Sequence, residues 1–249
     1  MKTLWLTVVI PAYNEKVNLA RGTLELVAGY LVARKYPWEA VIVDDGSTDG
    51  TGQLLDDFAG IHQNFRIIHN PHMGKAASVI TGALAGKGEI ILFTDMDQAT
   101  PISEADKLLP EFAAGSDIVI GSRSGREGAP FFRKVLALGM VFLRALILRL
   151  PFNDTQCGFK AFKAPAARRI FSIMRSAHPL KPISGPAVNP GFDVELLYIG
   201  RKLGYRINEL PVVWRHQKTE RVSFIKDSMN GIRELLLVRW RALTNAYKL

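Results

Sequence analysis

The chain has 249 residues, of which 48% are hydrophobic and 22% are charged. This is the composition of a globular protein with a sizeable core, and it excludes a disordered or low-complexity chain. The 32 lysines and arginines outnumber the 23 acidic residues, and the net charge of +9 favours anionic partners such as phosphates, nucleic acid or an anionic membrane face. Cys157 is the single cysteine, which excludes an internal disulfide and a cysteine-based metal site.

Strands and helices alternate over the first half of the chain. Buried strands are predicted at 4–10, where Pro11 ends the strand, and at 40–43, 66–68, 89–94 and 117–120. Helices are predicted between them at about 15–35, 50–59 and 75–85, and from Thr100–Pro101 onward. This alternation indicates βαβ units, and therefore an α/β fold with a mostly parallel sheet flanked by helices.

The pattern changes after residue 125. Residues 135–150 are strongly apolar, but four cations fall within an arc of roughly 160° on a helical projection. These cations are Arg133, Lys134, Arg144 and Arg149. We expect an interfacial helix whose basic face meets anionic lipid; the alternative is a core helix that buries the stems of its arginines.

The rest of the chain is predicted as a loop at 176–191, a helix at 192–203, a strand ending at Trp214 and a second basic, apolar helix at 225–243. No run reaches the roughly 18 uncharged residues of a membrane span, and the first ten residues do not resemble a signal peptide. We therefore expect a soluble or peripheral protein on the cytoplasmic side.

Polar clusters follow three of the predicted strands, at 11–15, 44–49 and 95–100. Ligands bind beyond the carboxyl ends of strands in open sheets of this kind, so we expect the clusters to share one site. Asp95 and Asp97 can point the same way because side chains alternate along a strand. Their oxygens suit Mg²⁺ or Mn²⁺, with Asp97 as the direct ligand and Asp95 acting through water or a ribose.

These blocks together resemble glycosyltransferase family 2, whose fold is called GT-A. Val9–Glu15, Val43–Asp49 and Asp95–Asp97 match the order and spacing of its nucleotide-sugar half. Three later blocks resemble the polyprenyl-phosphate sugar transferases, and among them the dolichyl-phosphate β-glucosyltransferases most. These blocks are Gly121–Arg123, Asp154–Lys160 and Phe192–Ile199. The resemblance implies a nucleotide-sugar half at 1–125, an acceptor half at 126–224 and a basic amphipathic helix at 225–249.

The resemblance implies an inverting transferase that moves a sugar, foremost glucose from UDP-glucose, onto polyprenyl or dolichyl phosphate at the cytoplasmic membrane face. The alternatives are a mannosyltransferase that uses GDP-mannose and a non-catalytic basic membrane-binding module. A nucleotidyltransferase would place a glycine-rich basic loop where this chain has residues 11–15. Nucleic acid is not an expected partner, because the acidic clusters would repel its backbone. Related glucosyltransferases carry an N-terminal membrane helix that we do not expect here, which leaves a membrane partner protein or a homo-oligomer open.

On the donor side, the resemblance implies a base and ribose pocket lined by Pro11, Tyr13, Asn14 and Glu15. We expect Asp44 to accept a hydrogen bond from the base, because a buried carboxylate needs a donor. Lys75 opens a helix after Gly74 and suits a phosphate, although a solvent-facing lysine is the alternative. Mannosyl relatives often place a glutamine ligand where this chain has Ala99, so Asp95 and Asp97 remain the expected metal ligands.

On the acceptor side, Arg123 and Arg133 are candidate catalytic residues together with Asp97, because a guanidinium can bind phosphate through two hydrogen bonds. Asp154 is expected to orient the arginines. Asp193 and Glu195 begin a helix, where they would position acceptor-side groups or cap the helix. Further expectations are a cation from Arg221, no zinc site at His69 and His72, and a solvated basic face of Lys160, Lys163, Arg168 and Arg169.

Overall fold

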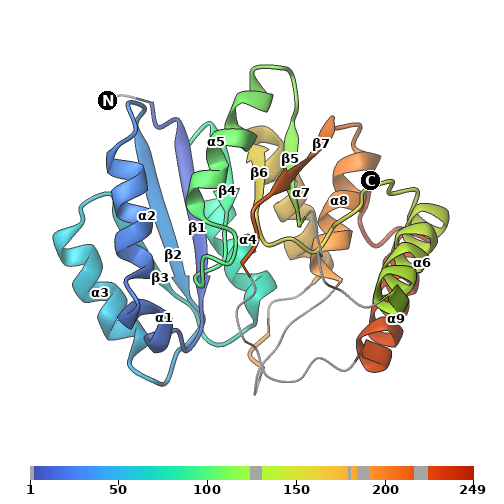
Figure 1. Ribbon diagram of the computed structural model, residues 1–249, viewed down its shortest axis with the longest axis horizontal. Helices are drawn as coiled ribbons and strands as arrows, with labels where there is room; N and C mark the ends of the chain where they lie inside the picture. The colour runs from blue at the N-terminus through green and yellow to red at the C-terminus, as the bar shows by residue number, and fades with distance from the viewer. Residues whose placement is uncertain (1–2, 124–130, 179–180, 184–190, 216–223) are drawn as a thin grey trace.

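The computed structural model describes residues 3–123, 131–178, 181–183, 191–215 and 224–249 (Figure 1). Among these residues, seven strands form one sheet in the order β3-β2-β1-β4-β6-β5-β7. The strands are β1 (Leu6–Ala12), β2 (Trp38–Asp44), β3 (Phe65–His69), β4 (Ile90–Phe93), β5 (Ile118–Arg123), β6 (Lys160–Lys163) and β7 (Ile207–Val212). All of them run in one direction except β6, which is antiparallel to both β4 and β5. The predicted α/β class with a mostly parallel sheet is confirmed.

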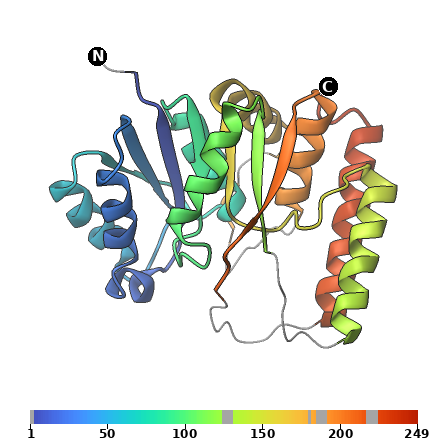
Figure 2. The same cartoon turned by 45° about the horizontal axis from the view of Figure 1, so that its top comes forward.

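Helices cover both faces of the sheet (Figure 2). They are α1 (Lys16–Ala20), α2 (Thr23–Val32), α3 (Thr51–Ile61), α4 (Lys75–Ala85), α5 (Ala105–Leu108), α6 (Phe131–Leu148), α7 (Ala164–Ala177), α8 (Phe192–Lys202) and α9 (Phe224–Leu243). One hydrophobic core packs α4, α7 and α8 against the sheet. A second core packs α2, α3 and α5 against the other face. This two-faced burial explains why the central strands are mostly apolar, with Thr7 of β1 and Glu39 of β2 hydrogen-bonded to each other.

The sequence predicted that Pro11 ends the first strand, and this was wrong. Pro11 lies inside β1, opposite Val43 of β2. The oxygen of Val9 faces β4, where it accepts from Thr94 N at 3.0 Å. Pro11 lies two residues further and faces the same side, but the pairing of β4 with β1 ends at Val9. The missing N–H of Pro11 therefore costs no ladder hydrogen bond.

Three other expectations are corrected. The predicted helix at 15–35 is two helices, because Gly22 between them has φ 76°. The helix expected after Pro101 is the short α5 flanked by 3₁₀ turns at Ile102–Glu104 and Leu109–Phe112. No element was predicted at 160–177, where the chain forms β6 and α7. β6 was missed because four residues give too short a pattern to recognise.

Helices α6 and α9 pack side by side at one end of the molecule (Figures 1 and 2). Each carries a row of exposed apolar side chains. On α6 these are Leu138, Phe142 and Leu146, and on α9 they are Met229, Leu236, Trp240 and Leu243. Within the described residues, no helix has the length and apolarity to cross a bilayer.

The prediction that Arg144 lies on a basic, lipid-facing side of α6 is wrong. This side chain is only 8% exposed and faces the protein, whereas Leu138 is 69% exposed. Arg144 faces inward because it donates hydrogen bonds to a loop beside the helix. The side chains of Arg133 and Lys134 lie outside the described residues, and Arg149 follows the end of α6 at Leu148. Apolar side chains of α6 therefore face solvent at Leu138, Phe142 and Leu146, while Leu143, Ile147 and Leu148 pack inward beside Arg144.

Candidate active site

The carboxyl end of the sheet gathers most of the described candidate residues. The strands that run in one direction end there, which brings together the segments after β1, β2, β4 and β5. β6 runs the opposite way, so its first residue, Lys160, lies at the same edge and pairs with Phe93. The three polar clusters therefore share one edge, as the sequence indicated.

Asp95 is held between a lysine and a glycine. Lys75 forms an ion pair with the Asp95 carboxylate through its ammonium group. The carboxylate also lies against Gly158, where any Cβ would overlap it. Asp97 accepts a hydrogen bond from Ala99 N at 2.9 Å, which folds the loop around it. A side chain at position 158 would close the space that Asp95 occupies.

The carboxylates at this edge repel one another. Burial raises the pKa of Asp97, and the charge of Asp95 raises it further. Burial likewise raises the pKa of Glu15, with contributions from the charges of Asp97 and Asp95. Burial lowers the pKa of Lys75, but the charges of Asp95 and Asp193 outweigh it, so the net pKa is raised. An added cation would relieve this repulsion.

A divalent ion fits these residues. No group of three or more His, Cys, Asp or Glu side chains within the described ranges is arranged to enclose a metal ion. Mg²⁺ and Mn²⁺ do not need such a cage, because they bind through one or two carboxylates and take their other oxygens from water and phosphate. Asp95 and Asp97 supply that donor set. Burial and the charge of Asp95 raise the pKa of Asp97, and a cation bound between the two carboxylates would favour their ionised forms.

The donor-side segments are linked by their own hydrogen bonds. Asn14 N donates to Ser47 Oγ at 2.9 Å, and Thr48 N donates to Asn14 Oδ1 at 2.8 Å. Glu15 N donates to Thr51 Oγ1 at 2.8 Å. The loops after β1 and β2 therefore form one wall of the site.

Asp44 and Asp45 are both buried and bind different histidines. Asp44 contacts His69 Nδ1 at 3.0 Å, and Asp45 contacts His72 Nδ1 at 2.7 Å. Asp45 also accepts from Gly74 N at 2.7 Å, which fixes the loop that leads into α4 and Lys75. His69 and His72 thus bind two different aspartates. The ring of Tyr13 stacks on His72 with centroids 4.0 Å apart, which gives the pocket an aromatic surface.

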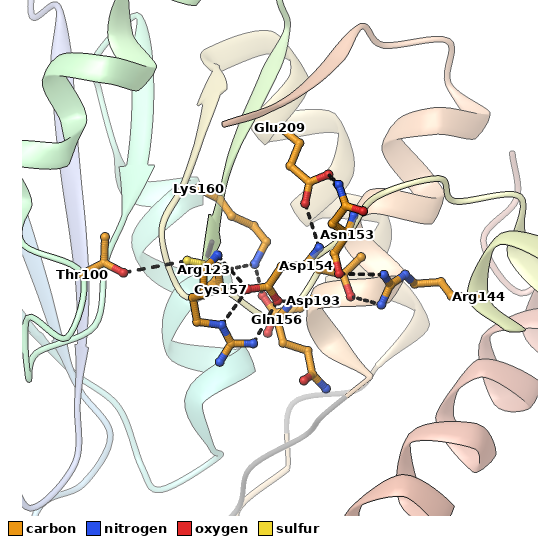
Figure 3. Close-up of polar contacts among 11 residues, drawn as sticks. Thr100, Arg123, Arg144, Asn153, Asp154, Gln156, Cys157, Lys160, Asp193 and Glu209 are labelled. Atoms are coloured by element: carbon orange, nitrogen blue, oxygen red, sulfur yellow. Dashed lines mark hydrogen bonds and ion pairs between the residues drawn. The ribbon is translucent and has the colours of Figure 1, made fainter. Parts of the chain in front are cut away.

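Arg123 and Asp154, which the sequence predicted on the acceptor side, form a two-bond ion pair (Figure 3). Arg123 Nε lies 2.6 Å from Asp154 Oδ2, and Arg123 Nη2 lies 2.9 Å from Asp154 Oδ1. Burial alone would raise the pKa of Asp154, but the guanidinium lowers it to about 2. Asp154 therefore stays ionised at neutral pH and holds Arg123 in one orientation. This is the partnership expected from the sequence.

Lys160 is fully buried, which contradicts its predicted place on a solvated basic face. Its Nζ lies 2.5 Å from Asp193 Oδ1 and also donates to the carbonyl oxygen of Cys157. The block that ends in Lys160 was singled out as a specific motif, and that was the signal for a functional position. Arg168 and Arg169 are exposed, as predicted.

Asp193 and Glu195 lie on opposite sides of α8, because two positions span about 200° of a helix. Asp193 reaches Lys160 at the edge of the sheet. Glu195 is buried away from it and bonds to His178 Nε2 at 2.7 Å, to Arg241 Nη1 at 3.3 Å and to the Tyr247 hydroxyl at 2.5 Å. The structure therefore brings Asp193, but not Glu195, to the candidate site.

A cavity of about 410 Å³ opens beside Asp97. Its lining includes Asn18, Gln98 and two exposed arginines, Arg21 and Arg215, which the sequence analysis did not single out. Gln98 is not placed as a ligand, because its side chain bonds to Asp95 O and Ile102 N. Arg133 belongs to α6, but its side chain lies outside the described part of the structure, as does all of Arg221.

The fold and the site together define an α/β protein with a metal-competent carboxylate pair at the carboxyl edge of its sheet, near the partly exposed Lys75 and Arg123 and the buried Lys160. The family model for glycosyl transferase family 2 matches residues 7–171. The chain therefore belongs to this family.

Curated relatives share much of the sequence. A dolichyl-phosphate β-glucosyltransferase of Trichomonas vaginalis is 36% identical over 225 residues, covering 85% of this chain and 66% of the relative. The human dolichyl-phosphate β-glucosyltransferase is 31% identical over 266 residues, covering 99% of this chain and 78% of the relative. The chain thus spans just under two thirds of the length of the T. vaginalis relative.

Solved structures share the fold. Glucosyl-3-phosphoglycerate synthase from Mycobacterium tuberculosis, in complex with Mn²⁺, UDP and glucosyl-3-phosphoglycerate, has a TM-score of 0.64 and 19% identity over 95% of this chain and 80% of its own. A mannosyltransferase from Pyrobaculum calidifontis, in complex with GDP-mannose and Mn²⁺, has a TM-score of 0.62 and 21% identity over 96% of this chain and 64% of its own. The predicted GT-A fold is confirmed.

Proposed function

We propose that this chain is an inverting glycosyltransferase that moves glucose from UDP-glucose onto dolichyl or another polyprenyl phosphate. The observation that carries the proposal is the meeting of two groups of residues at one edge of the sheet. Asp95, Asp97 and Lys75 suit a nucleoside diphosphate, and Arg123, oriented by Asp154, suits a second anion. The names of the relatives support this choice of sugar and acceptor.

The proposed step exchanges one bond at the anomeric carbon for another. An oxygen of the acceptor phosphate attacks that carbon from the face opposite the donor diphosphate. The bond to the β-phosphate oxygen breaks, and UDP leaves with the electron pair. A phosphate monoester has its second pKa near 6, so its oxygen is already largely anionic at neutral pH and needs no strong general base.

Residues of this chain would have two tasks in this step. Lys75 and the start of α4 would hold the donor phosphates, since a helix N-terminus and a lysine both favour anions. Arg123, oriented by Asp154, would hold the acceptor phosphate. Asp95 and Asp97 would hold Mg²⁺ or Mn²⁺, which when bound neutralises the charge that develops on the departing diphosphate.

The experiment that tests this function offers the purified chain radiolabelled UDP-glucose, UDP-N-acetylglucosamine or GDP-mannose with a short polyprenyl phosphate and Mn²⁺ or Mg²⁺. We expect a glucosyl-phosphoryl-polyprenol from UDP-glucose alone. A mannosyl product from GDP-mannose would show that the donor is GDP-mannose and not UDP-glucose. Absence of any lipid-linked product from all three donors would reject the proposal.

A binding measurement accompanies the assay. UDP with Mn²⁺ at about 100 times its Kd should stabilise the fold by about 2.7 kcal/mol, which is roughly 5–10 °C in Tm for a domain of this size. UDP or Mn²⁺ alone should shift the Tm little, because the carboxylates and the diphosphate repel one another without the ion. A shift that does not depend on the metal would contradict the role of Asp95 and Asp97.

We also propose that α6 and α9 hold the protein on the cytoplasmic face of a membrane. The structure leaves apolar rows on both helices facing solvent, and the acceptor carries an apolar chain that would lie in the bilayer. The net charge of +9 would add attraction to an anionic leaflet. Membrane contact through these rows would bring the lipid phosphate toward Arg123.

Replacing Leu138, Phe142 and Leu146 together by Gln should lower binding to vesicles of phosphatidylcholine and phosphatidylserine at least about tenfold. Each side chain would lose on the order of 1 kcal/mol of burial in the bilayer. Val17→Gln with Ile61→Gln is the matched control, since both side chains are exposed but lie on α1 and α3. Sedimentation with vesicles measures both. Equal binding of the two variants would reject the docking face.

A further inference from the structure

The segment that carries Asp154 is held on its N–H side by Glu209 of β7. Asn153 N donates to Glu209 Oε2 at 2.8 Å, and Asp154 N donates to Glu209 Oε1 at 2.7 Å. One carboxylate therefore fixes two successive peptide groups (Figure 3). This contact ties the segment to the sheet, since Glu209 pairs in register with Ile120 of β5.

Arg144 of α6 holds the same segment on its carbonyl side. Its guanidinium donates to the carbonyl oxygens of Phe152 and Asn153, the latter at 3.2 Å, and to Thr155 Oγ1 at 3.2 Å. These acceptors are uncharged oxygens, and burial lowers the pKa of Arg144. Burying a cation costs free energy unless hydrogen bonds offset its lost hydration. For Arg144, these hydrogen bonds all go to the segment that carries Asp154. A purely packing role would be better served by an apolar side chain.

We infer that Arg144 is a positioning residue for the acceptor phosphate. Arg144 and Glu209 clamp the peptide groups of residues 152–154 from two directions, and this fixes Asp154. Asp154 in turn fixes Arg123 through two hydrogen bonds. The chain of contacts links α6, whose outer face is apolar, to the cation that we assign to the acceptor. The inference rests on the proposed function and adds to it the residue that connects α6 with the site.

Arg144→Met should raise the KM for polyprenyl phosphate by roughly 10- to 100-fold, because a small misplacement of a positioned group costs about that much. The KM for UDP-glucose should stay unchanged, since the donor side has no contact with Arg144 in the described structure. In an Asp154→Asn background the same replacement should add little, because both act through Arg123. Arg149→Met is the control, as Arg149 is exposed just beyond the end of α6.

Hydrogen exchange gives a readout that does not need turnover. The amides of Asn153 and Asp154 should exchange faster in Arg144→Met than in Arg149→Met, because half of their clamp is lost. Equal exchange in the two variants, or an equal rise in both KM values, would overturn the inference. If the unmodified chain transfers no sugar, the proposed function fails, and the exchange measurement still decides whether Arg144 holds the segment.

Discussion

Asp97→Ala should abolish sugar transfer while leaving the fold intact. We expect turnover to fall on the order of 10³-fold or more, which corresponds to about 4 kcal/mol of lost stabilisation of the leaving diphosphate. The stability without metal should not fall, because burial and the charge of Asp95 already raise the pKa of Asp97. Removing one of several carboxylates that repel one another relieves the remaining ones.

Two measurements check this prediction together. Thermal unfolding with and without UDP and Mn²⁺ should show that the variant keeps its own Tm but loses the shift that depends on the metal. Asp106→Ala is the control. Asp106 lies on the surface of α5, and its carboxylate pairs with Arg34. Such a pair contributes about 0–1 kcal/mol. If Asp97→Ala still transfers sugar at the normal rate, the assignment of Asp97 as a metal ligand is rejected.

Lys160→Met should destabilise the protein by roughly 3–5 kcal/mol, because it leaves the Asp193 carboxylate without its buried cation. For a domain of this size, that is a fall in Tm of roughly 6–20 °C. Methionine keeps the length and the apolar stem of lysine, so the effect reports the lost charge rather than a cavity. Sugar transfer should fall as well, since Asp193 faces the site beside Lys75.

The double variant Lys160→Met with Asp193→Asn separates the two effects. Removing both charges should restore most of the Tm, because a buried ion pair can be replaced by uncharged groups at little cost. Transfer should stay low if Asp193 works in the site. Lys163→Met is the matched control on the same strand, since Lys163 is 38% exposed and pairs with Asp117 at the surface. A Tm for Lys160→Met equal to that of the control would show that the buried pair does not stabilise the fold.

Local pattern was enough for the fold class and for the donor side of the site. The alternation of apolar strands and amphipathic helices defines βαβ units, and these impose a common direction on most of the strands. The polar clusters after β1, β2 and β4 must then meet at one edge, because parallel strands end together. Asp95 and Asp97 could be placed at this edge without coordinates, since they follow β4 directly, although they lie in the turn beyond Phe93 and not on the strand whose alternation was used to orient them.

The acceptor side needed the tertiary structure. The motif that ends in Lys160 marked this residue, but its burial at the site follows from no local pattern, because it depends on β6 running antiparallel to its neighbours. Arg144 shows the same limit, since a helical projection finds which residues share a face but not which face turns inward. That direction is set by what packs against the helix, here the carbonyl groups of residues 152 and 153.

The sequence by itself therefore determined the α/β architecture and the carboxylate pair, because both rest on spacing along the chain, and it indicated the family through the resemblance of its motifs. Only the tertiary structure decided that Lys160 is buried, that Glu195 lies away from the site and that α6 exposes its apolar row. These features depend on contacts between segments far apart in sequence, and the free energy of burying a charge is decided by partners that no local pattern contains.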